Sequence, residues 1–110
     1  MDLQIQIATS DRMLVFDLMN VKTLQVGMTN SISPDITLRL NQQTLFESVG
    51  TPDIFTFTVS IGKDIAVGVF SAWLYDKLKD RKRKLTINGT TVNVNKDEIN
   101  RVLAEKTKQP

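Results

Sequence analysis

The stretch that decides the fold runs from residue 54 to residue 106 and has the sequence IFTFTVSIGKDIAVGVFSAWLYDKLKDRKRKLTINGTTVNVNKDEINRVLAEK. Its first part, Ile54–Ile61, alternates apolar or aromatic side chains with threonine and serine. This alternation predicts a strand whose Phe55, Phe57 and Val59 face a core. The rest of the stretch predicts a helix, a hairpin and a second helix in that order.

Residues 62–80 carry apolar side chains every three or four positions, which predicts a helix with an apolar stripe more than 100° wide. We expect Ser60 or Gly62 near its N-cap. Because the first half of this helix is apolar nearly all round, we expect that half to be buried on more than one side. Gly68 costs the helix about 1 kcal/mol relative to alanine, so we expect another element to approach closely there.

Residues 84–94 predict a β-hairpin, because the Asn88-Gly89 pair stands between two runs rich in β-branched residues and both members tolerate positive φ. Asn95 follows as the expected N-cap of a short helix over residues 96–106, with Glu98 in capping-box spacing. A hairpin and a capped helix therefore close the C-terminal half.

The N-terminal half is less regular. Residues 3–7 alternate leucine and isoleucine with glutamine, which predicts a half-buried strand. The apolar spacing over residues 10–28 favours a helix with Ser10 as its N-cap. Leu24, Val26 and Met28 also alternate, so a strand at the end of that segment stays open.

A polar segment at residues 29–35 contains Pro34 and predicts a loop. Residues 36–40 then alternate and predict a short strand. Residues 41–49 have an ambiguous pattern that fits one or two helical turns. Residues 50–53 predict a turn at the junction between the two halves.

These elements together predict one α+β domain spanning residues 1–110, with residues 1–52 as its less regular half and residues 54–106 as strand, helix, hairpin and helix. We expect a mixed or antiparallel sheet of four or five strands with two or three packed helices. A chain of 110 residues is long enough to bury one sizeable core.

The chain contains no cysteine and no histidine. Their absence excludes disulfides, thiolate catalysis, serine–histidine hydrolysis and histidine- or cysteine-ligated zinc. The aspartates are scattered without the spacing of a calcium loop, and Gly62-Lys63-Asp64 lacks the rest of a phosphate-binding loop. We therefore expect no enzyme activity, no catalytic residue, no metal site and no cofactor.

Charge is concentrated in one place. Residues 77–84 hold six of the 14 basic side chains and one of the 12 acidic ones, so the remainder of the chain is mildly acidic. Cations at the C-terminal end of a helix interact favourably with the helix dipole and keep an exposed turn solvated. This is the simpler explanation of the charge cluster. The functional explanation is an electrostatic docking patch, for which the candidates are Lys79, Arg81, Lys82 and Arg83. We call these four residues the basic patch.

The N-terminus has no apolar core of signal-peptide length, so we expect no secretion. The longest nearly uncharged apolar stretch, Ile65–Tyr75, spans 11 residues, whereas a bilayer needs about 20. We therefore expect no membrane insertion and a location in the cytoplasm.

Residues 54–106 contain, in order, an apolar strand, a glycine-containing helix ending in Ala72-Trp73-Leu74-Tyr75-Asp76-Lys77-Leu78, a basic stretch, the Thr86-Ile87-Asn88-Gly89 turn and a capped helix. This order resembles that of effector-associated constant components. These are small α+β modules of bacterial conflict or signalling systems, and the resemblance covers residues 54–106. It implies a non-enzymatic adaptor in the bacterial cytoplasm that binds a protein partner.

Two other functions stay open at this point. The basic cluster at residues 77–84 could bind nucleic acid, which would make binding steeply dependent on salt. The chain could also be a structural or assembly subunit of a phage or prophage, which would appear as a homo-oligomer independent of the basic patch.

Overall fold

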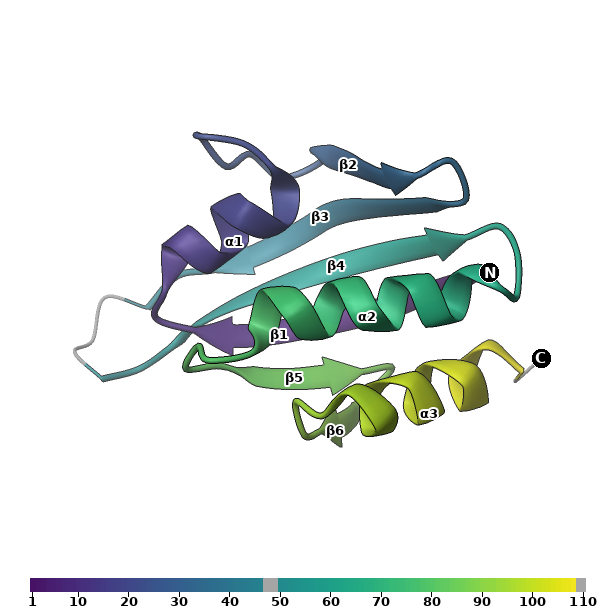
Figure 1. Cartoon of the computed structure of the whole chain (residues 1–110). Helices are drawn as coiled ribbons and strands as arrows, with labels where there is room; N and C mark the ends of the chain where they lie inside the picture. Colours follow the sequence, from purple (N-terminus) through teal and green to yellow (C-terminus); the bar gives the residue numbers. More distant parts are fainter. Residues whose placement is uncertain (47–49, 109–110) are drawn as a thin grey trace.

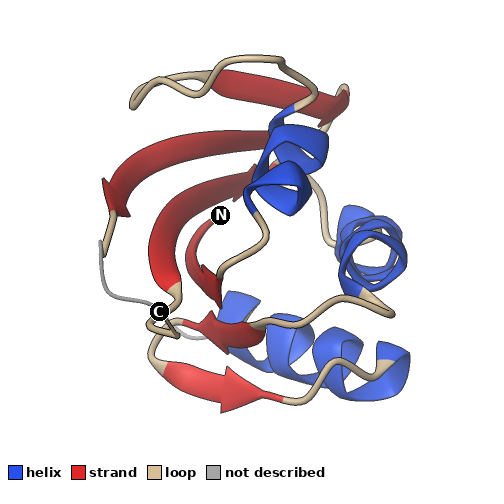
Figure 2. Ribbon diagram, turned by 90° about the vertical axis from the view of Figure 1, so that its left-hand side faces the viewer, coloured by secondary structure: helices blue, strands red, loops and turns tan. Residues whose placement is uncertain are grey.

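The computed structural model describes residues 1–46 and 50–108, and within these ranges six strands form one antiparallel sheet in the order β2-β3-β4-β1-β5-β6. In chain order the elements are β1 (Asp2–Thr9), α1 (Arg12–Met19), β2 (Thr29–Ser33), β3 (Ile36–Thr44), β4 (Asp53–Ile61), α2 (Ala66–Leu78), β5 (Lys84–Ile87), β6 (Thr90–Val92) and α3 (Lys96–Thr107). The three helices lie on one side of the sheet (Figures 1 and 2). The predicted α+β class is confirmed, with more strands than expected.

The core lies between the sheet and the helices. Strand β4 shows the expected alternation, with Phe55, Phe57 and Val59 fully buried and Ser60 exposed on the other face. Strand β1 lies in the middle of the sheet, because it pairs with β4 on one side and β5 on the other. Its inward-facing Ile5 is opposite Phe57 on β4 and Ile87 on β5.

The first helix is much shorter than the predicted segment of residues 10–28. Helix α1 begins after Asp11, not Ser10, because the Asp11 carboxylate accepts hydrogen bonds from the backbone N–H groups of Met13 and Leu14. It ends at Asn20, which adopts the left-handed conformation with φ 56°. The chain then forms a turn, so neither the long helix nor the alternative strand at residues 24–28 is present.

The polar segment predicted as a loop contains the extra strand. Strand β2 pairs with β3, and the two-residue turn at Pro34-Asp35 joins them. Backbone hydrogen bonds to β3 form this strand despite its polar side chains, because a sheet ladder needs only N–H and C=O groups. Strand β3 continues to Thr44, so the predicted helical turns are absent from residues 41–46; residues 47–49 lie outside the described part.

Helix α2 is shorter than the predicted range of 62–80, and it begins after Ile65 without a side-chain cap. One side, including Phe70, Leu74 and Leu78, is buried against the core. The expected burial on more than one side is wrong, because Ile65 and Val69 are 81% and 54% exposed. The helix belongs to an outer layer, and only its inward side meets the sheet (Figure 2).

The expected close approach at Gly68 is also wrong. A Cβ atom built on Gly68 would meet no other atom within 4 Å among the described residues. Within a single chain, therefore, nothing in the packing requires a glycine at this helical position.

Replacing Gly68 by alanine is expected to raise the free energy of unfolding by about 1 kcal/mol, because alanine restricts the unfolded chain and favours the helix. Urea unfolding monitored by circular dichroism measures the change. An unchanged or lower midpoint would contradict the open surroundings found at this residue.

The C-terminal hairpin and helix match the sequence prediction. Asn88 and Gly89 both have positive φ, 45° and 83°, as the tight turn requires. The Asn88 side chain also accepts a hydrogen bond from the backbone N–H of Gln4 at 2.7 Å, which attaches the turn to β1. Asn95 caps α3 by accepting from the N–H groups of Asp97 and Glu98.

Candidate functional site

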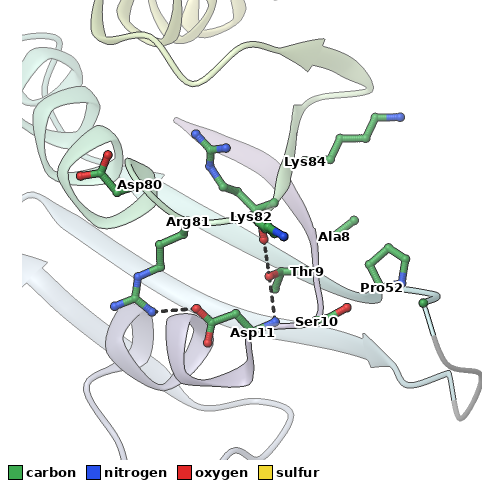
Figure 3. A pocket seen from close by; sticks show the side chains of 11 residues that line it. Ala8, Thr9, Ser10, Asp11, Pro52, Asp80, Arg81, Lys82 and Lys84 are labelled. Atoms are coloured by element: carbon green, nitrogen blue, oxygen red, sulfur yellow. Dashed lines mark hydrogen bonds and ion pairs between the residues drawn. The ribbon is translucent and has the colours of Figure 1, made fainter.

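A cavity of about 780 Å³ opens beside the loop that joins α2 to β5. Its walls come from the end of β1, the start of α1, the residues around Pro52 and the loop itself (Figure 3). We call it the basic cleft. Its described lining residues are Ala8, Thr9, Ser10, Asp11, Gly50, Pro52, Asp80, Arg81, Lys82, Arg83 and Lys84.

Local backbone geometry directs the loop across the cleft. Helix α2 ends at the buried Leu78, and the N–H of Lys79 still donates to the carbonyl of Tyr75. Lys79 leaves the helical conformation with ψ 148°, and Asp80 then adopts a positive φ of 62°, so the chain turns away from the helix. At Lys84 the chain pairs with Ala8 of β1 and becomes β5. The segment 81–84 therefore passes from the helical layer to the sheet.

Side-chain contacts attach this segment to the junction of β1 and α1. The Arg81 guanidinium binds the Asp11 carboxylate at 3.1 Å and the Asp17 carboxylate at 2.7 Å. The Thr9 hydroxyl donates to the carbonyl of Lys82 at 2.8 Å and accepts from the N–H of Asp11 at 3.0 Å. Figure 3 shows the Arg81–Asp11 and Thr9 contacts side by side. We call the contacts of Arg81 and Thr9 the clamp.

The structure divides the basic patch into residues with different surroundings. Lys79 lies outside the described lining of the cleft and pairs with Asp76 at 3.0 Å. The hydrogen bond and charge of Asp76 raise the pKa of Lys79. Arg81 is neutralised by its two carboxylates, whereas Lys82 and Arg83 line the cleft.

Three cations of the cleft have no acidic partner among the described residues. No carboxylate of residues 1–46 and 50–108 lies within 4.0 Å of Lys82, Arg83 or Lys84. The Nε atom of Arg83 is buried and finds no hydrogen-bond acceptor in the described part of the chain. This arrangement can bind oxyanions.

Sequence reasoning did not identify Thr9 or Asp11 as part of the site, and the basic patch did not include Lys84. Lys84 belongs to the predicted charge cluster, so the composition could have found it. No sequence pattern marks Asp11 as part of a site, and in the structure it is the N-cap of α1. Its contact with Arg81, 70 residues away, leaves no signal in the local sequence.

A separate buried carboxylate stabilises the start of β4. Asp53 is 5% exposed, accepts a hydrogen bond from the N–H of Phe46 at 2.9 Å and pairs with Arg12 at 3.1 Å. The Phe46 hydrogen bond, followed by the Arg12 contact and against the opposing effect of burial, lowers the pKa of Asp53 below its ordinary value. The charged form is therefore favoured in the folded state.

Asp53 is expected to make stability fall in acid. Because its pKa is lower in the folded than in the unfolded state, its contribution is complete above about pH 4 and is lost as the pH falls through the folded value. Replacing Asp53 by asparagine should lower stability at neutral pH and flatten the decrease below pH 4. Melting temperatures of the wild type and the variant, measured between pH 7 and pH 3, test this. Melting temperatures that fall in parallel with pH in both proteins would contradict it.

Among the described residues, no cluster of histidine, cysteine, aspartate and glutamate side chains could hold a metal ion. No helix in the same part of the chain is both long and apolar enough to cross a membrane. Comparisons with protein-family models, curated proteins and solved structures find no significant match to this chain.

Proposed function

We propose that the protein is a non-enzymatic module that binds an acidic segment of a partner protein in the basic cleft. The observation that carries this proposal is the set of three cations, Lys82, Arg83 and Lys84, that line a cavity of about 780 Å³ without a carboxylate partner among the described residues. The resemblance of residues 54–106 to effector-associated constant components supports an adaptor role in a bacterial conflict or signalling system of the cytoplasm.

The composition of the cleft favours a protein over a nucleic acid. Proteins that bind single strands combine cations with aromatic side chains on which bases stack. None of the described residues that line the cleft is aromatic. Trp73, the only tryptophan, lies outside that lining and stacks on Phe70 at 5.8 Å instead. Ala8 and Pro52 add apolar surface suited to the side chains of a peptide.

The surroundings of Arg83 also support a binding role. A buried donor without an acceptor costs about 1–3 kcal/mol, and like charges on Lys82 and Lys84 add to the cost of placing a cation there. Arg83 therefore lowers the stability of the free protein. Its presence is explained if its charge contributes to ligand binding.

Replacing Arg83 by methionine is expected to raise the free energy of unfolding by about 1 kcal/mol, because the aliphatic packing is kept and the unsatisfied donor is removed. The same change should weaken binding of an acidic peptide. Urea unfolding and peptide titration of one protein sample measure both effects. A loss of stability would show that Arg83 serves mainly to hold the fold.

The proposal is tested with a fluorescein-labelled peptide of about ten glutamates, titrated with the protein and followed by anisotropy at several salt concentrations. The comparison probes are a lysine peptide of equal length and a single-stranded DNA of equal charge. We expect salt-sensitive binding of the glutamate peptide and weaker binding of the DNA. Tighter binding of the DNA would replace the proposal by nucleic-acid recognition, and no binding of either anion would overturn both.

A second candidate function is self-assembly through α2, as in a structural subunit. Its exposed edge carries Ile65 and Val69 beside Gly68, where a second helix could approach closely. Each end of this edge carries one cation and one anion, so two copies can pair without net repulsion. These pairs are Lys63 with Asp64 and Asp76 with Lys79.

Light scattering after size-exclusion chromatography tests the second candidate. The variants are Val69→Lys and, as a control that adds the same charge elsewhere, Asn93→Lys, at an exposed residue between β6 and α3. An oligomer that dissociates only in Val69→Lys would support self-assembly through α2. A monomeric wild type at high concentration would exclude it.

A further inference from the structure

The ion pairs of Arg81 distinguish it from Lys82, Arg83 and Lys84, the other cations that line the cleft. It belongs to the basic patch, but its guanidinium is held by Asp11 and Asp17 on α1. A guanidinium bound to two carboxylates adds no positive charge to the site as a whole. Its direct attraction for an acidic ligand is therefore small.

The same contacts fix the segment that carries the ligand-binding cations. Arg81 directly precedes Lys82, whose carbonyl accepts a hydrogen bond from Thr9 at 2.8 Å. Asp11 is itself anchored, because its other carboxylate oxygen caps α1. The side chain of Arg81 and the carbonyl of Lys82 thus attach two consecutive residues of the loop to one rigid junction.

We propose that Arg81 is a positioning residue for the basic cleft: it holds Lys82 and Arg83 in place through Asp11 and Asp17 and does not itself contact the acidic partner. It has a second effect, since its charge neutralises Asp11, which lines the same cleft and would otherwise repel an acidic ligand. This inference rests on the proposed function.

Asp17 provides a test in which charge and positioning act in opposite directions. Asp17 is exposed and lies outside the described lining of the cleft. If only net charge mattered, Asp17→Ala would tighten binding of an acidic peptide. If Asp17 positions the loop through Arg81, the same change should weaken binding, by about three- to five-fold for one exposed ion pair. Arg81→Ala, which breaks both ion pairs, should weaken it by about ten-fold.

Asp64→Ala is the matched control. It removes the same charge from an exposed residue before α2, and no ion pair within 4.0 Å is found for Asp64 among the described residues. Its binding of the glutamate peptide should be equal to or slightly tighter than wild type. Binding by Asp17→Ala that is as tight as by Asp64→Ala would overturn the inference.

Amide hydrogen exchange gives a readout that does not depend on the ligand. Arg81→Ala and Asp17→Ala should speed exchange in residues 79–86, whereas Lys82→Ala, which removes a ligand-binding charge, should weaken peptide binding without changing exchange there. Unchanged exchange in both clamp variants would overturn the positioning role even if binding falls. If the wild type does not bind the peptide, the proposed function is wrong, and so is the role of Arg81 in binding. Hydrogen exchange would still show whether the clamp orders the loop.

Discussion

Replacing Ile5 by aspartate should leave most of the protein unfolded at neutral pH. Ile5 is 1% exposed at the centre of the middle strand, opposite Phe57 and Ile87. The change loses about 2–3 kcal/mol of apolar burial, and burying a carboxylate without a partner adds several kcal/mol. The sum is comparable to the whole stability of a typical domain, about 5–15 kcal/mol.

Far-UV circular dichroism and urea unfolding measure this effect. Gln4→Asp is the control, because it places the same side chain one residue earlier on the exposed face of β1. It should change the free energy of unfolding by about 1 kcal/mol or less. A cooperative transition for Ile5→Asp near the wild-type midpoint would mean that β1 is not a central strand.

Changing Lys82, Arg83 and Lys84 together to glutamate should reduce affinity for the glutamate peptide by about a hundred-fold or more. Each reversal replaces an attraction by a repulsion, and charge pairs near a protein surface contribute on the order of 1 kcal/mol or more each at close range. The effect should shrink at high salt, because added ions screen exposed charges beyond about 10 Å at 0.1 M. This is the largest functional effect that the structure predicts.

The matched control changes Lys63, Lys96 and Lys108 to glutamate. These lysines are exposed and lie outside the described lining of the cleft, and the net charge changes by the same amount. Binding by the control variant should stay within a few-fold of wild type. Equal losses in both variants would show that the overall charge governs binding and that the cleft has no special part in it.

Strand β4, the β5–β6 hairpin and helix α3 could be predicted from local sequence. Strand β4 follows from the alternation of Phe55, Phe57 and Val59 with small polar residues, and the hairpin follows from Asn88 and Gly89, whose positive φ values the sequence implied. Asn95 fixed the start of α3. In each case the residues that determine the conformation lie within a few positions of one another, so a short window of sequence contains the physical cause.

Tertiary contacts decided several features that local sequence did not predict. Strand β2 forms from polar residues because β3 offers hydrogen-bonding partners, and α1 stops at Asn20 although apolar residues continue at helical spacing beyond it. The apolar spacing of α2 did not show which of its sides would face the sheet. Ile65 and Val69 therefore looked buried in the sequence and are exposed in the structure.

The sequence by itself determined the fold class, the exclusion of histidine and cysteine chemistry and the place of the charge cluster. Only the tertiary structure showed that Arg81 is neutralised while Lys82, Arg83 and Lys84 line a cleft. The physical reason is distance along the chain. The carboxylates that bind Arg81 lie 64 and 70 residues before it, and a local pattern records which residues are charged but not which distant charges the fold will bring together.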